Sequence, residues 1–304
     1  MSTMSRVPRK YRLWLKARLF RVRSFLTRYL LSYGGRKLLE RLRTLGVRTG
    51  DTVLLHSSFE EHHGFRGTIQ DVTDVFIEAL GPSGNLLMVS LPYRSSSLLY
   101  LSKLKRFDVR KTPSMMGMLS ELFRRRAGVL RSLSPTHPML ALGPKAAWFV
   151  AGHHLCQYPC GPGSPFEKLV TADAKAVFYN VDFDAYTFFH YLEHLVHSQM
   201  PFSLYTDTPF QAQVVDHDGV ASTVPTYAFA PDAMRRRRFE VLDAELRRRD
   251  AIKVCRIGNG SVTVVRIRET VDCVQDMSRR GVYFYDFTGL PRPAANSTQA
   301  AGKA

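Results

Sequence analysis

The segment between residues 52 and 90 constrains the fold more than any other part of the sequence. An apolar run over residues 52–56 precedes a glycine-containing loop, and a helical pattern over residues 69–80 stops at Gly81-Pro82 before a second apolar run over residues 86–90. Continuous apolar runs are typical of strands buried on both faces, and strands that alternate with helices tend to pair in parallel. This segment therefore predicts an α/β sheet with some parallel pairing.

The other elements extend this unit into one large domain. We expect strands and hairpins at residues 140–142, 175–181, 211–228 and 252–268, and helices at residues 36–45, 116–126, 145–151, 186–197 and 232–249. Residues 91–113 are expected to be irregular, and Ser114 is a candidate N-cap. The prediction is a single α/β domain over residues 32–288, with a central mixed sheet flanked by helices and with the C-terminal hairpins added to it. The tail over residues 289–304 is small and polar, and we expect it to be disordered.

The positive charge of the chain is concentrated at its N-terminus. The net charge is +17, and residues 1–48 carry 14 Lys and Arg against one acid, Glu40. The remaining 256 residues are nearly neutral, with 29 basic against 25 acidic side chains. A protein with a nucleic-acid-binding groove would spread its basic residues through the fold, so no nucleic-acid partner is expected.

The basic arm over residues 1–31 has moderate helical amphipathicity. Two interpretations fit: a helix lying on an anionic membrane surface, and a helix packed on the domain with a solvated basic face. Apolar runs fall short of a membrane span, and the arm lacks the apolar core of a secretory signal. Four cysteines in 304 residues suit reduced thiols. We expect a cytoplasmic protein. Under the first interpretation of the arm, it would also contact the inner membrane surface peripherally.

Residues 186–197 hold the densest group of titratable and aromatic side chains. On a helix, His190, Glu193 and His194 lie on one face. A histidine oriented by a carboxylate can act as a general base near neutral pH. The same letters spell H-x-x-E-H, a zinc-hydrolase pattern, which needs a third ligand such as Glu240 or Glu245. Those two carboxylates lie in an arginine-rich helix whose charged residues are predicted to face solvent, so we expect no metal.

Several short blocks occur in the order found in one enzyme family. They are Gly50-Asp51, Leu54-Leu55-His56-Ser57-Ser58, Thr112-Pro113-Ser114-Met115-Met116-Gly117, Arg131-Ser132, Pro135-Thr136-His137, Gly163-Ser164-Pro165-Phe166 and Thr187-Phe188-Phe189-His190-Tyr191-Leu192-Glu193. Each block alone is weak, but together they cover roughly residues 36–200. In this order they resemble the aminoglycoside 3-N-acetyltransferase family, also called antibiotic N-acetyltransferases.

The resemblance implies an α/β enzyme that moves an acetyl group from acetyl-CoA to an amine of an amino sugar. It places His190 and Glu193 at the acceptor amine. The residues that it assigns to the cofactor are His56, Ser57, Ser58, Thr112, Ser114 and Gly117. Arg131 is a further candidate, because a guanidinium can pair with phosphates. His137 is a second candidate base or acceptor-site residue.

The sequence also departs from the family pattern near the acceptor. Tyr186 stands where antibiotic-inactivating members have Asn, and Ser134-Pro135 stands where they have His-Pro. Phe188 and Phe189 add bulk, so we expect an aromatic acceptor pocket suited to the face of a sugar ring. Two acceptors are compatible with this pattern, an aminoglycoside or an amino sugar of a surface polysaccharide precursor. A zinc hydrolase is the less favoured alternative.

Overall fold

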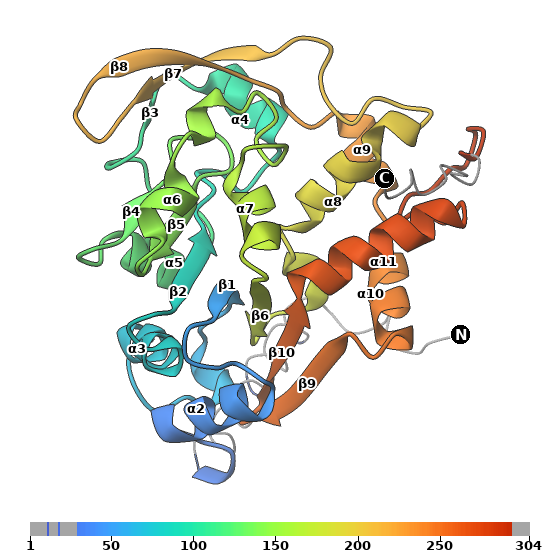
Figure 1. Cartoon of the computed structure of the whole chain (residues 1–304). Helices are drawn as coiled ribbons and strands as arrows, with labels where there is room; N and C mark the ends of the chain where they lie inside the picture. The colour runs from blue at the N-terminus through green and yellow to red at the C-terminus, as the bar shows by residue number, and fades with distance from the viewer. Residues whose placement is uncertain (1–10, 12–17, 19–28, 294–304) are drawn as a thin grey trace, which may run out of the picture.

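A computed structural model describes Tyr11, Arg18 and residues 29–293 of the chain. Its main feature is a seven-stranded mixed sheet (Figure 1). In spatial order the strands are β4 (Leu130–Arg131), β5 (Met139–Leu142), β2 (Asn85–Val89), β1 (Thr52–Ser57), β6 (Lys175–Tyr179), β10 (Gly260–Arg266) and β9 (Ile252–Ile257). Strand β1 pairs in parallel with β2 and β6, whereas the outer pairs are antiparallel. The predicted fold class, α/β with a central mixed sheet flanked by helices, is confirmed.

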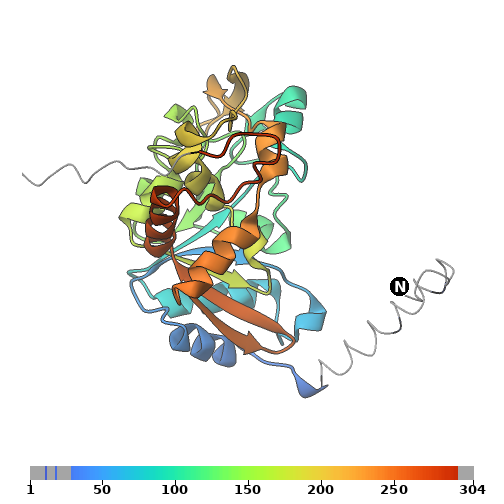
Figure 2. The ribbon, with the colours of Figure 1, turned by 90° about the vertical axis from the view of Figure 1, so that its right-hand side faces the viewer.

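Helices cover both faces of this sheet because its strands are apolar on both sides. Val53 and Leu55 pack in one core cluster, and Leu54 between them packs in the other. One layer consists of α2 (Gly35–Thr44), α3 (Ile69–Leu80) and α5 (Met118–Arg124). The other consists of α6 (Ala146–Val150), α7 (Pro165–Thr171), α8 (Phe189–Val196), α10 (Phe239–Arg248) and α11 (Ile267–Arg279). Figure 2 shows the sheet from its side.

A smaller second sheet lies at one end of the molecule, at the top of Figure 1. The predicted hairpin forms it, as β7 (Phe210–Val215) and β8 (Ala221–Thr226), joined by β3 (Phe107–Asp108) in parallel with β7. The second predicted hairpin, β9 and β10, is instead an integral part of the main sheet, because β10 pairs along its length with β6. Only the first hairpin is therefore an addition to the domain.

Three local predictions are wrong. Residues 91–113 contain a helix, α4 (Ser97–Lys103), whose N-cap Ser96 accepts a hydrogen bond from the backbone N–H of Leu99. The N-cap of α5 is Gly117 with a φ of 100°, so Ser114 is not the cap. The helix expected over residues 232–249 is two helices, α9 (Pro231–Arg236) and α10, and an extended backbone at Arg237 separates them. Helix α11 follows β10 and was not predicted.

Close packing at the start of α6 requires a glycine. Gly143 has a φ of 128°, and a Cβ atom there would lie 2.3 Å from the carbonyl oxygen of Gly84. This contact holds the end of β5 against the loop that begins β2.

The prediction for the basic arm falls almost entirely on residues outside the described part, as does that for most of the tail. Within the described residues, no helix is both long enough and apolar enough to cross a bilayer. All four cysteines are among the described residues, and each is free.

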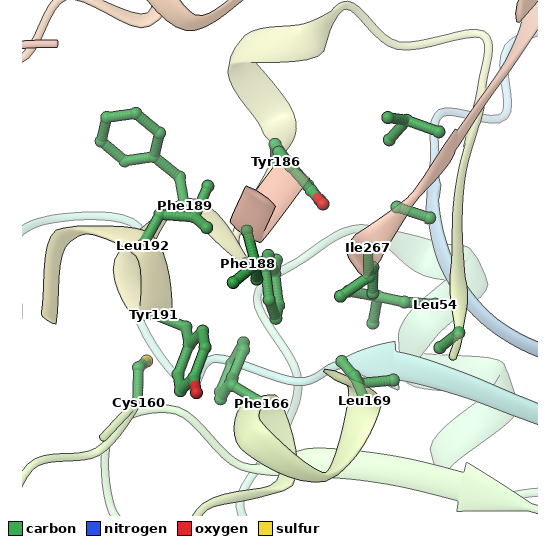
Figure 3. Packing of buried hydrophobic residues seen from close by; sticks show 14 of the residues in the cluster. Leu54, Cys160, Phe166, Leu169, Tyr186, Phe188, Phe189, Tyr191, Leu192 and Ile267 are labelled. Carbon is green, nitrogen blue, oxygen red and sulfur yellow. The ribbon is translucent and has the colours of Figure 1, made fainter. Parts of the chain in front are cut away.

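The aromatic residues beside α8 belong to the core. Tyr186, Phe188 and Phe189 are each at most 1% exposed, and Figure 3 shows them packed among Leu54, Phe166 and Leu192. They cannot form an acceptor pocket in this conformation, so the interpretation that assigned them to one is wrong. Their bulk instead fixes the start of α8, because its first residues are anchored on the sheet.

Candidate active site

Helix α8 begins ten residues after the carboxyl end of β6, at the sheet edge where ligands of α/β proteins usually bind. The apolar face of α8 is buried. His190 and Glu193 lie one turn apart on another face of the helix. The imidazole Nδ1 of His190 is 2.8 Å from Oε2 of Glu193. Glu193 is fully buried, whereas 16% of the His190 side chain is exposed. The structure thus joins the two residues predicted as base and orienting group.

Arg237 and Tyr285 complete the surroundings of the Glu193 carboxylate. Arg237 donates from Nε to Oε1 at 2.6 Å and from Nη2 to Oε2 at 2.8 Å. The Tyr285 hydroxyl donates to Oε1 at 2.7 Å. With His190, each carboxylate oxygen therefore has two partners, which fixes the orientation of the carboxylate.

These contacts set the protonation states of the pair. Burial raises the pKa of Glu193, but the charge of Arg237 and the hydrogen bond from His190 outweigh burial, and the net pKa is below its usual value. Burial, followed by the charge of Arg237, lowers the pKa of His190, although Glu193 acts in the opposite direction. Near neutral pH, His190 is thus a neutral imidazole beside an ionised carboxylate. Since Glu193 accepts at Nδ1–H, the lone pair of His190 is on Nε2.

His137 lies beside His190, so the structure brings the two candidate bases together. The two imidazole centroids are 5.3 Å apart in an edge-to-face arrangement, and both rings contact Phe229. His137 is buried, and its Nε2 is 3.4 Å from the Tyr93 hydroxyl. Burial, then the nearby His190, lowers the pKa of His137 well below its usual value. His137 is therefore neutral as well.

The arrangement does not suit the zinc interpretation. In that pattern the glutamate must be free to act as a base, but both oxygens of Glu193 are occupied by Arg237, Tyr285 and His190. Nδ1 of His194 is 2.9 Å from the Tyr205 hydroxyl, so this ring nitrogen already has a partner. In the described part of the chain, no three His, Cys, Asp or Glu residues gather as metal ligands would.

One group of predicted cofactor residues forms a single bridged unit. The Arg131 guanidinium donates to the carbonyl oxygens of Thr112 and Ser90, at 2.5 and 2.8 Å, and the residue is 3% exposed. Thr112 Oγ1 accepts from the Asp108 backbone N–H, and Ser114 Oγ is 2.8 Å from Ser120 Oγ. In this arrangement the Arg131 guanidinium stabilises the backbone. Its hydrogen bonds to carbonyl oxygens leave it less free to pair with a phosphate.

The other group lies at the carboxyl end of β1. His56 is buried, stacks on Phe178 at 5.1 Å and meets the edge of Tyr186 at 5.9 Å. Ser57 and Ser58 follow it and are partly exposed, and the Ser58 N–H donates to the carbonyl of Tyr179. Gly117 belongs to the first group, as the N-cap of α5. It has open space where a side chain would lie, so a ligand can approach its backbone.

Buried polar atoms without partners mark the same edge of the sheet. They are His56 Nε2, Ser90 Oγ, Thr136 Oγ1 and His137 Nδ1. Ser90 follows β2, and its N–H donates to the carbonyl of Pro138, which places it beside Thr136 and His137. Buried polar atoms are normally satisfied, and several unsatisfied atoms in one region point to a ligand that supplies the missing partners.

Arg237 and Tyr285 were missed by sequence reasoning. The run Arg235–Arg238 was interpreted as a solvated face, which holds for Arg235 (70% exposed) but not for Arg237 (9% exposed). Helical spacing offers no signal for Arg237, because its backbone is extended between α9 and α10. No signal exists for Tyr285 either, which reaches Glu193 from the C-terminal segment beyond α11.

Comparison with known proteins identifies relatives of this architecture. The family model described as aminoglycoside 3-N-acetyltransferase matches residues 54–279. Aminoglycoside N(3)-acetyltransferase III of Pseudomonas aeruginosa is 29% identical over an alignment of 170 residues, and the match covers 52% of this chain and 62% of that protein. The chain thus spans less than two thirds of the length of this curated relative.

Solved structures share the fold over most of the chain. A structure of AAC-VIa bound to sisomicin has a TM-score of 0.67 at 25% identity and covers 82% of this chain and 98% of that one. A binary structure of AAC-IIIb with CoASH has a TM-score of 0.68 at 22% identity, with 82% and 97% covered. The segment after residue 279, which supplies Tyr285, lies outside the matched family region.

Proposed function

Because the chain belongs to the aminoglycoside 3-N-acetyltransferase family, we propose that it transfers an acetyl group from acetyl-CoA to an amine of an aminoglycoside or related amino sugar. The observation that carries the proposal is the neutral His190 held by a buried, ionised Glu193. An amine is nucleophilic only without its extra proton, and this pair is built to remove one.

In the proposed reaction, Nε2 of His190 accepts a proton from the acceptor amine as the amine nitrogen attacks the thioester carbonyl. The new C–N bond forms and the C–S bond breaks. The CoA thiolate leaves and takes the proton from the His190 imidazolium, which restores the neutral base. Glu193 stabilises the transient imidazolium, as the carboxylate does in a Ser-His-Asp triad. Such proton transfer contributes roughly 10²–10⁴ to the rate.

Acetyl-CoA is the proposed acetyl donor, and a related structure was solved with CoASH. His56, Ser57, Ser58, Thr112, Ser114 and Gly117 are the residues proposed to border it. Of these, Ser57 and Ser58 offer hydroxyls at a strand end, and Gly117 offers open backbone. We propose for Arg131 that it shapes this border, because its donors contact the carbonyls of Ser90 and Thr112.

The acceptor itself is identified by a screen. Purified protein and acetyl-CoA are incubated with a panel of aminoglycosides and amino sugars, and acetylated products are detected by mass spectrometry together with released thiol. The proposal predicts an acceptor that yields equal amounts of acetylated amine and CoA thiol. Thermal stabilisation by acetyl-CoA is the accompanying binding test, since a ligand of the folded state raises its stability. The absence of both signals would refute the proposal.

A further inference from the structure

A cavity of about 630 Å³ lies close to the candidate active site. Its aromatic wall is formed by Tyr158, Tyr205 and Tyr227, and we refer to it as the tyrosine pocket. The Tyr158 ring stacks on Tyr227 at 4.8 Å and packs against Tyr205 at 4.7 Å. A volume of this size is typical of pockets for small molecules.

The tyrosine pocket is connected to α8 and to His190. The Tyr205 hydroxyl is 2.9 Å from Nδ1 of His194, one turn after His190 on the helix. The Tyr205 ring stacks on Phe229 at 5.3 Å, and Phe229 lies 4.6 Å from the His190 ring. These two separations place the Tyr205 ring no more than about 10 Å from the imidazole of His190. Two linked sugar rings are therefore long enough to reach from the pocket to His190.

The loop that carries Tyr158 is fixed from within the domain. Ser132 Oγ is 2.7 Å from Nδ1 of His153, and Nε2 of His153 is 2.8 Å from the carbonyl oxygen of Pro159. Both side chains are 1% exposed. In addition, the backbone N–H of Tyr227 donates to the carbonyl oxygen of Gln157. The pocket wall is therefore preformed, which lowers the ordering cost of binding.

The chemistry of the lining suits a neutral ring better than a polycation. Among the described residues that line the pocket, Asp207 is the single carboxylate, and no Lys or Arg is present. A ligand with several ammonium groups would need several carboxylates for electrostatic complementarity. Aromatic side chains instead provide apolar area, and the hydroxyls of Ser203 and Thr206 are suited to sugar hydroxyls.

We propose that the tyrosine pocket binds a neutral sugar ring of the acceptor, while a linked amino sugar presents its amine to His190. The acceptor is then a glycoside of at least two rings with few amines rather than a polycationic antibiotic. This inference rests on the proposed function for the transfer step, but binding of the neutral ring can be measured without it.

The kinetic test compares two acceptors that each carry one amine, galactosylglucosamine and glucosamine. Replacing Tyr227 by Ala should raise KM for galactosylglucosamine roughly tenfold, the loss expected for one aromatic contact. The KM for acetyl-CoA and the kcat/KM for glucosamine should stay unchanged. Tyr227→Phe keeps the ring and should match the wild type. Equal effects of Tyr227→Ala on both acceptors, or no effect on either, would overturn the inference.

Two additions separate failure of the pocket from failure of the function. Binding of cellobiose, which has no amine, is measured by saturation-transfer NMR. Binding to the wild type with loss in Tyr227→Ala supports the pocket even if no acceptor is acetylated, and equal or absent binding in both proteins overturns it. Ser203→Trp, at an exposed position on the rim, fills the cavity without touching the core and should give the same losses if Tyr227→Ala does not fold.

Discussion

Replacement of Arg237 by Leu should destabilise this protein more than loss of any exposed arginine. The side chain makes a two-point ion pair with Glu193, at 2.6 and 2.8 Å, and its partner is fully buried. Removing one member of a buried pair leaves an uncompensated charge and typically costs about 3–5 kcal/mol. We therefore expect a fall of about that size in the free energy of unfolding at pH 7.

The assay is urea denaturation followed by far-ultraviolet circular dichroism, with Arg235→Leu as the matched control. Arg235 lies two residues away, and its side chain is 70% exposed in a 3.3 Å pair with Asp232. An exposed pair contributes about 0–1 kcal/mol. The double variant Arg237→Leu/Glu193→Leu should be more stable than Arg237→Leu alone, because it also removes the buried charge.

The effect of Arg237→Leu should also depend on pH, with a defined sign. The pKa of Glu193 is lowered in the folded state, so its stabilising contribution is present above its unfolded-state pKa and is lost as the pH falls. Without Arg237, burial dominates and Glu193 is protonated at higher pH. The stability difference between wild type and variant should therefore shrink on acidification. A difference equal to that of Arg235→Leu, or one that is constant with pH, would refute this reasoning.

Three further predictions concern the same region. Tyr285→Phe removes the 2.7 Å hydrogen bond to ionised Glu193. This variant should lower the free energy of unfolding by about 1.5–3 kcal/mol and reduce kcat without changing the acceptor KM. An unchanged kcat in steady-state kinetics would contradict a positioning role. Burial lowers the pKa of His56 from 6.5 to about 3. The stability contribution of neutral His56 is therefore present above pH 6.5 and decreases as the pH falls. His56→Phe should flatten the dependence of Tm on pH in the acid range, and an unchanged slope would contradict this prediction. Gly143→Ala places a methyl group 2.3 Å from the Gly84 carbonyl oxygen and should lower the urea midpoint by an amount corresponding to roughly 1–3 kcal/mol, whereas an unchanged midpoint would mean that the loop moves freely.

Local sequence signals were sufficient to predict an element where its start and stop are encoded in adjacent residues. Helix α3 was predicted at its observed limits from its helical pattern and the stop at Gly81-Pro82. The structure adds a capping box of Thr68 and Asp71 at its start. The apolar runs of β1, β2 and β6 likewise predicted buried strands. The spacing of His190 and Glu193 predicted their contact, because residues three apart on a helix are neighbours.

The features that the sequence did not predict depend on contacts between distant segments. No local pattern shows that β10 pairs with β6, which turns a predicted appendage into part of the main sheet. Arg237 is separated from Glu193 by 44 positions and Tyr285 by 92, so their roles follow only from the tertiary fold. Phe188 and Phe189 illustrate the reverse case, since aromatic residues near a site serve the core as readily as a ligand.

The most direct test of the account is acetyl transfer in a single turnover by wild type and His190→Ala. Each protein is preloaded with acetyl-CoA, mixed with an acceptor found in the screen, and quenched at intervals for mass spectrometry. The account predicts that His190→Ala binds acetyl-CoA as the wild type does but forms acetylated amine about 10²–10⁴ times more slowly. Transfer at the wild-type rate by His190→Ala would contradict the assignment of His190 as the base.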